Sequence, residues 1–154
     1  MKNGRNLVAI YARVSTKIQS VDSQLLPLRR YCEARGFQIY REYIDLGISG
    51  TKASRPQLNE LMDDAQKRKF DILLVFKLDR FGRSTRHLIT TIEELDRLGI
   101  TFISFTENLD LGSNTGRLIF HILSALAQFE RDLIRERVIA GLEAARAKNK
   151  ILGR

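Results

Sequence analysis

Short apolar runs that alternate with amphipathic segments constrain the fold of this chain most strongly. The strand-like runs lie at 6–13, 37–44, 71–76 and 100–105. The segments with helical spacing between them lie at 20–35, 56–69 and 85–98. Strands that alternate with helices predict an α/β fold with a mainly parallel central sheet flanked by helices.

Proline, glycine and serine set the expected limits of these elements. Pro27 lies inside the first helical segment and predicts that the helix starts later than Ser20. Ser54 is expected to cap the second helix, with Pro56 in its first turn. The connections are predicted to be a mobile loop at 45–54, a tight link with a sharp turn at Gly82 over 78–84, and a polar loop at 108–115.

The C-terminal segment predicts one long helix. After Gly116 the chain runs to about Lys150 without proline and with a single glycine, and its apolar residues keep helical spacing. A helix of about 35 residues is about 50 Å long, which exceeds what a domain of this size can cover. We therefore expect a compact domain over 1–115 and a helix over 116–150, whose second half projects toward a partner surface.

Charge and composition narrow the class of protein. The 26 Lys and Arg residues exceed the 18 Asp and Glu residues, which gives a net charge of +8 and favours a polyanionic partner such as nucleic acid. A single cysteine excludes an internal disulfide, and no apolar run approaches the roughly 18 residues of a membrane span. The start of the chain lacks a signal-peptide pattern, so we expect a cytoplasmic protein.

Ser15 is the candidate nucleophile. It follows the first predicted strand, and open α/β sheets bind ligands at the carboxyl ends of their strands. A serine hydroxyl needs a base or nearby positive charge to react, and His87 and His121 both lie on predicted helices, which makes a Ser-His-Asp triad improbable.

Arginine residues can supply the positive charge that would activate Ser15 in place of a histidine base. The arginines at strand ends or in loops that can converge on one rim of the sheet are Arg13, Arg55, Arg80 and Arg83. Such a cluster binds phosphate, offsets charge in a phosphoryl-transfer transition state and lowers the cost of a serine alkoxide. Asp79, the one carboxylate among these basic residues, can orient an arginine or transfer a proton. The set therefore favours attack on a phosphodiester.

Four segments together resemble the serine recombinase family, which comprises resolvases and DNA invertases. They are YARVSTKIQS at 11–20, DLGISGTKASRPQL at 45–58, KLDRFGRS at 77–84 and ILSALAQFERDLIRERVIAGLEAARAKN at 122–149. The resemblance implies that Ser15 attacks a DNA phosphate, which leaves a 5′-phosphoserine and a free 3′-hydroxyl. It implies that the four arginines bind and activate the phosphate, and it assigns Gln19 and Asp79 to the active site. The general acid and base stay open between Asp79 and an arginine.

The resemblance also implies partners. Members act without a metal or a high-energy cofactor, as dimers that assemble into tetramers on DNA, and the long helix resembles their dimerisation helix. The expected DNA contacts are Lys77, Arg131, Arg135, Arg146 and Lys148. Relatives continue beyond the position of 151–154 into a helix-turn-helix domain that reads the DNA site, so we do not expect sequence-specific binding by this chain alone.

Two other functions compete with this interpretation. A catalytically silent module of the same fold, which dimerises and binds DNA, requires the loss of a catalytic residue, and none of the expected ones is missing. An ordinary nucleotide-binding domain requires a glycine-rich loop after the first strand, and the segment RVSTKIQS contains no glycine.

Overall fold

The computed structural model describes residues 6–14, 19–47, 55–82 and 84–148, and of Gln19 and Ser20 it describes only the backbone. Within these residues one sheet has the strand order β2-β1-β3-β4-β5. The strands are β1 (Leu7–Val14), β2 (Gln38–Leu46), β3 (Ile72–Val75), β4 (Thr101–Ser104) and β5 (Leu109–Asp110). The first four are parallel to one another, and β5 is antiparallel to β4.

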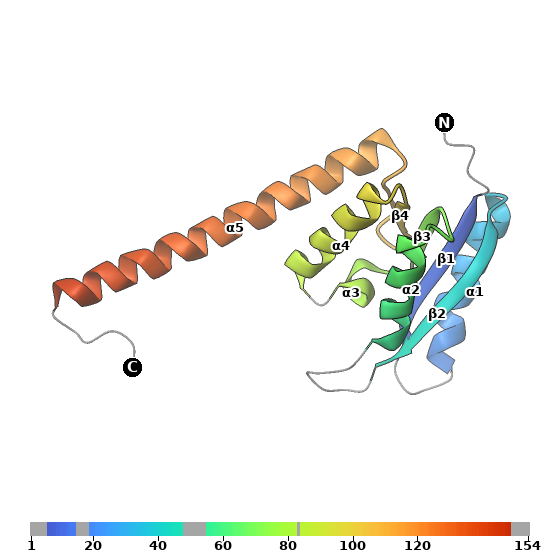
Figure 1. Cartoon of the computed structure of the whole chain (residues 1–154), viewed down its shortest axis with the longest axis horizontal. Helices are drawn as coiled ribbons and strands as arrows, with labels where there is room; N and C mark the ends of the chain where they lie inside the picture. The colour runs from blue at the N-terminus through green and yellow to red at the C-terminus, as the bar shows by residue number, and fades with distance from the viewer. Residues whose placement is uncertain (1–5, 15–18, 48–54, 83, 149–154) are drawn as a thin grey trace. The chain divides into compact units, whose positions relative to one another are not determined.

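Helices cover both faces of this sheet. Helix α1 (Gln19–Ala34) lies on one face, and α2 (Pro56–Gln66), α3 (Leu78–Phe81) and α4 (Thr85–Arg97) lie on the other (Figure 1). On the first face, Leu25 and Leu28 of α1 pack in one buried cluster with Val8 and Ile10 of β1. The predicted α/β fold, mainly parallel and flanked by helices, is therefore confirmed.

Helix α5 (Asn114–Ala147) begins two residues before the predicted position. Its first turn approaches β5 so closely that a Cβ atom on Gly116 would lie 1.9 Å from the carbonyl oxygen of Asp110, so this position requires glycine. The chain divides into two compact units, Met1–Arg117 and Leu118–Arg154. No helix in the described part of the chain is long and apolar enough to cross a membrane.

Several local predictions were wrong, and each has a physical cause. Helix α1 begins at Gln19 and continues through Pro27, because Leu25 and Leu28 are buried against the sheet. Burying two leucines contributes about 3–6 kcal/mol, which offsets the roughly 3 kcal/mol cost of an internal proline. The N-cap of α2 is Arg55 and not Ser54, whose position lies outside the described residues.

Two short elements escaped the sequence pattern. Helix α3 occupies part of the predicted tight link, and β5 occupies part of the predicted polar loop. With four and two residues respectively, both are shorter than the window over which hydrophobic periodicity is detectable. Gly82 has an extended backbone (φ −89°, ψ 143°), so it does not serve a sharp turn. It is needed for space instead, because a Cβ atom there would lie 2.6 Å from Cβ of Leu88.

Candidate active site

The carboxyl ends of β1, β2 and β3 form one edge of the sheet, since these strands are parallel. Arg13, the penultimate residue of β1, pairs in register with Asp45 of β2. Ser15 follows the last residue of β1 directly in the sequence. Ser15, Arg83 and the side chain of Gln19 lie outside the described residues.

The backbone that precedes Ser15 is tied to two neighbouring elements. The amide of Gly47 donates to the carbonyl oxygen of Val14 at 2.6 Å, and the side-chain amide of Gln24 in α1 donates to the carbonyl oxygen of Arg13 at 3.1 Å. The half-buried Arg13 side chain passes beside Gly47, where a Cβ atom would lie only 3.3 Å from Nε. The two hydrogen bonds hold the end of β1, and the Arg13 side chain leaves little room for a side chain at position 47.

Asp45 organises the start of α2 from the end of β2. Its buried carboxylate accepts hydrogen bonds from the amides of Gln57 and Leu58 at 2.9 and 3.0 Å, which are the donors an N-cap residue normally satisfies. Arg55 occupies the N-cap position and forms no side-chain cap bond, since a guanidinium has no acceptor atom. The carboxylate of Asp45 thus caps the helix that begins next to Arg55.

Arg55 links α2 to α3. Only 3% of its surface is exposed, and its Nη1 donates to the carbonyl oxygen of Phe81, the last residue of α3, at 2.5 Å. The ring of Phe81 packs edge-on against Tyr11 of β1 with 5.8 Å between centroids. Arg55, α3 and β1 therefore belong to one packed unit at the sheet edge.

Tyr11 completes this buried network. Its hydroxyl donates to Asp45 at 2.9 Å. Burial raises the pKa of Tyr11 most, and the negative charge of Asp45 raises it further, whereas the positive charges of Arg55 and Arg13 oppose the rise. The phenol therefore stays protonated as a donor to Asp45, and both arginines lie within electrostatic reach of it.

Helix α3 presents the remaining described candidates. Asp79 and Arg80 are exposed on it, and Lys77 is half-buried at its N-cap. Because α3 follows β3 after a short link, these residues lie at the same sheet edge as Arg13 and Arg55. The structure thus brings together the described members of the predicted phosphate site.

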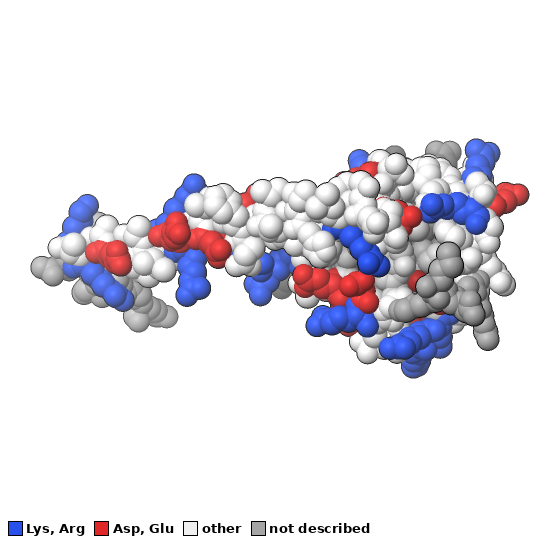
Figure 2. Space-filling view, turned by 90° about the horizontal axis from the view of Figure 1, so that it is seen from above, with Lys and Arg blue, Asp and Glu red and all other residues white. Residues whose placement is uncertain are grey.

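The other predicted DNA contacts belong to the second unit. Arg131, Arg135 and Arg146 are exposed on α5, and Lys148 is exposed just after its end. Figure 2 shows basic and acidic side chains interspersed on the second half of α5, while the face of the first half in view is largely uncharged.

Sequence reasoning missed three members of the site network. The sequence pattern assigns no role to Tyr11 or Gln24, and it places Asp45 only at the start of the predicted loop at 45–54. Alternation along β2 carried a usable signal, because Tyr43 and Asp45 lie two residues apart and share the buried face. A buried carboxylate at a strand end needs donors, and the next helix supplies them.

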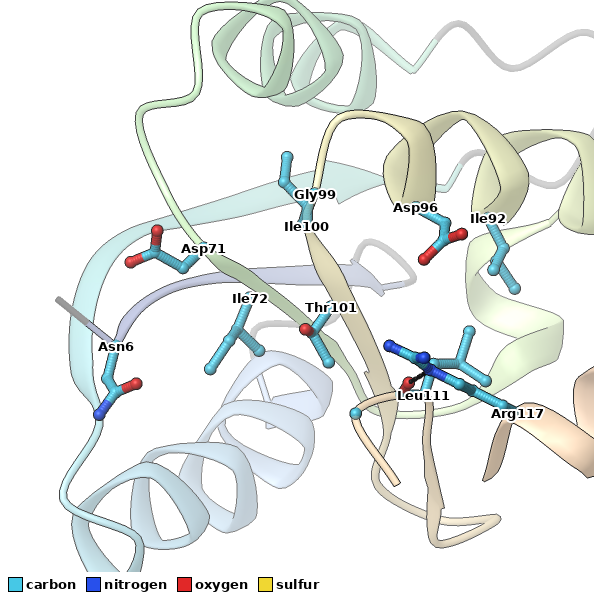
Figure 3. Close-up of a pocket in the computed structure, with 11 residues that line it drawn as sticks. Asn6, Asp71, Ile72, Ile92, Asp96, Gly99, Ile100, Thr101, Leu111 and Arg117 are labelled. Carbon is cyan, nitrogen blue, oxygen red and sulfur yellow. Dashed lines mark hydrogen bonds between the residues drawn. The ribbon is translucent and has the colours of Figure 1, made fainter. Parts of the chain in front are cut away.

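A separate cavity of about 530 Å³ lies at the amino end of the sheet, where Asn6, Asp71 and Thr101 flank the starts of the strands (Figure 3). Two of its charged side chains bind the chain itself. Asp71 accepts from the amide of Leu7 at 3.1 Å, and Nε of Arg117 donates to the carbonyl oxygen of Leu111 at 3.0 Å. The candidate active site is at the opposite edge.

A mainly parallel sheet with Arg13 and Arg55 near the carboxyl ends of its strands belongs to the class of α/β proteins that bind ligands at that edge. Residues 8–151 match the family described as Resolvase, N terminal domain. The chain is 46% identical over 145 residues to the serine recombinase gin of Escherichia phage Mu, which covers 94% of this chain and 70% of that protein. It is 40% identical over 144 residues to the transposon Tn917 resolvase of Enterococcus faecalis, with 94% and 73% covered.

Solved structures agree. The N-terminal catalytic domain of TP901-1 integrase superposes with a TM-score of 0.75 at 43% identity, which covers 82% of this chain and 98% of that one. A resolvase family site-specific recombinase from Streptococcus pneumoniae gives a TM-score of 0.76 at 32% identity, with 91% and 98% covered. The chain belongs to the resolvase family of serine recombinases, enzymes of site-specific DNA recombination, as its motifs predict.

Proposed function

We propose that this chain cleaves and rejoins DNA strands through Ser15, with Arg13, Arg55, Arg80 and Arg83 as the phosphate-binding groups. The observation that carries the proposal is the meeting of Arg13, Arg55 and α3 at the sheet edge where the backbone leads into Ser15. Guanidinium groups fixed in a packed network stabilise charge on a phosphoryl group without reorganising during the reaction.

The proposed step is a phosphoryl exchange. Oγ of Ser15 forms a bond to the scissile phosphorus, and the bond from phosphorus to the 3′ oxygen breaks. The serine loses its proton and the leaving 3′ oxygen gains one, with Asp79 or an arginine as the group that transfers it. The phosphoserine bond retains the energy of the broken linkage, so attack by a 3′-hydroxyl reverses the step without another energy source. Gln19 is proposed to support the same site.

Assembly and DNA contact are assigned to the C-terminal segment. We propose residues 1–115 as the catalytic part and 116–150 as the part that dimerises and contacts DNA, with pairs of dimers forming a tetramer during strand exchange. The apolar side chains exposed along α5, among them Leu126, Phe129 and Ile134, support this assignment. Since the proposed substrate is DNA, we place the activity in the cytoplasm.

Trapping of the covalent intermediate tests the function. Protein incubated with a labelled pool of DNA duplexes of randomised sequence is denatured and separated from free DNA. The wild type is expected to retain labelled DNA, Ser15→Ala is expected to retain none, and Ser20→Ala serves as the matched serine control. A wild-type protein without adduct supports the silent DNA-binding module instead, and an adduct that survives Ser15→Ala contradicts the proposed nucleophile.

A further inference from the structure

The first turn of α3 lacks a cap of its own. This four-residue helix starts at Leu78, and its N-cap residue, Lys77, makes no side-chain cap bond. A lysine ammonium has three donors and no acceptor, so it cannot satisfy the amides that a helix start leaves unpaired. The acceptor must come from elsewhere.

Glu107, in the turn after β4, supplies that acceptor. Its Oε1 accepts from the amide of Leu78 at 3.3 Å, and its Oε2 accepts from the hydroxyl of Ser104. Ser104 is fully buried as the last residue of β4. One carboxylate oxygen is therefore anchored to the sheet, and the other caps the helix.

The same turn clamps the segment that leads into α3. The amide and the hydroxyl of Thr106 both donate to the carbonyl oxygen of Phe76, at 2.9 and 2.7 Å. The amide of Phe105 donates to the carbonyl oxygen of Val75 at 2.9 Å, and the rings of Phe76 and Phe105 stack with 6.0 Å between centroids. The link between β3 and α3 is thus held along its length by the turn that contains Glu107.

Helix α2 is built in the same way. Its N-cap position holds Arg55, and Asp45 at the end of β2 provides the cap. Both helices that bring proposed phosphate-binding arginines to the edge thus have a basic residue at the N-cap and a carboxylate cap from a neighbouring strand end. This arrangement keeps cations at the site while the helix amides remain satisfied.

We infer that Glu107 is a positioning residue for DNA cleavage, which acts by capping α3 and so holding Asp79 and Arg80 at the scissile phosphate. The inference rests on the proposed function. Glu107 contacts the backbone of α3 and the sheet, and its effect on the reaction passes through the helix.

Three variants test the inference. Glu107→Ala removes both hydrogen bonds. Glu107→Gln removes the charge but keeps an oxygen for the Leu78 amide and a donor for Ser104. Glu93→Ala removes an exposed carboxylate from α4 as the matched control. We measure single-turnover adduct formation with the randomised duplex pool at saturating protein, together with the affinity for the pool.

Glu107→Ala is expected to slow adduct formation at least about tenfold, because a misplacement near 1 Å costs up to about a hundredfold in rate. DNA affinity is expected to stay within about twofold, and Glu107→Gln is expected to restore most of the rate. Unchanged cleavage in Glu107→Ala overturns the inference while the proposed function stands. Equal loss in Glu107→Ala and Glu107→Gln overturns the capping role in favour of a charge effect.

Hydrogen exchange supplies a readout that does not depend on cleavage. The amide of Leu78 is expected to exchange faster in Glu107→Ala than in the wild type, and at the wild-type rate in Glu107→Gln and Glu93→Ala. Unchanged exchange at Leu78 in Glu107→Ala overturns the inference even if the wild type forms no adduct. A wild type that forms no adduct overturns the proposed function, whatever the exchange at Leu78 shows.

Discussion

At the scale of single residues, the carboxylate of Asp45 holds the start of the helix that carries Arg55. Asp45 accepts hydrogen bonds from Tyr11, Gln57 and Leu58, so both of its carboxylate oxygens have partners. Arg55 and Arg13 are the guanidinium groups that we propose bind the phosphate. Their location follows from hydrogen bonds made by residues that never need to touch DNA.

Asp45→Asn tests this division of roles. An asparagine keeps one acceptor oxygen and turns an NH₂ group toward the remaining donors, so we expect a loss of about 1–3 kcal/mol in the free energy of unfolding. Adduct formation is expected to fall as well, since the start of α2 beside Arg55 loses its cap. Urea unfolding measures the first effect, with the exposed Asp96→Asn as control. An unfolding free energy within about 0.5 kcal/mol of the wild type would refute the role of Asp45.

The sequence predicts the arginines of the proposed site, but it does not predict the residues that hold them. The residue type, order and strand-end position of the arginines predict a phosphate site. The partners of Asp45 lie 12 to 34 residues away in sequence, and the Leu78 amide lies 29 residues from Glu107. No local spacing reports such pairs, because parallel strands bring distant segments to one edge.

At the scale of elements, a buried hydrogen bond joins Asp64 of α2 to Tyr43 of β2. The carboxylate of Asp64 accepts from the hydroxyl of Tyr43 at 2.6 Å and lies 3.0 Å from Nζ of Lys69. Burial alone would raise the pKa of Asp64, but the bonds from Tyr43 and Lys69 and the nearby charge of Arg41 outweigh it, and the pKa is lowered.

The lowered pKa predicts how stability depends on pH. A carboxylate whose folded-state pKa lies below its ordinary value of 3.8 stabilises the fold fully above that value. This contribution is lost as pH falls through the folded-state pKa. Asp64→Asn is therefore expected to be less stable near pH 7 and to lose less stability between about pH 5 and about pH 3. Urea midpoints across this range measure it, with Asp63→Asn as control, and parallel curves for Asp64→Asn and the wild type would refute it.

The long elements of the fold could be predicted because their patterns span many residues. The strand runs and α4 followed their expected positions within a few residues, whereas α3 and β5 had no pattern of sufficient length. The passage of α1 through Pro27 depended on packing against β1, which sequence spacing does not weigh. The features that the sequence does not predict are therefore the two short elements and the helix that continues through a proline because its neighbours are buried.

At the scale of the whole molecule, the exposed apolar side chains of α5 lead us to expect self-association. Leu126 and Phe129 of α5 are 53% and 60% exposed, which is unusual for large apolar side chains set at helical spacing. Leu126→Glu is expected to shift sedimentation toward the monomer, whereas Gln128→Glu adds the same charge on the polar side of the helix and is expected to leave association unchanged. Equal sedimentation of Leu126→Glu and wild type would exclude this face as the interface.

We propose that Ser15, which follows β1 in the sequence, becomes bonded to DNA at the edge where Arg13, Arg55 and Asp45 lie. Mass mapping of the trapped adduct tests it most directly. After nuclease and protease digestion, we predict a 5′-linked nucleotide on the peptide that contains Ser15, with fragmentation that locates the phosphate on that side chain. A nucleotide carried by any other residue would contradict the account.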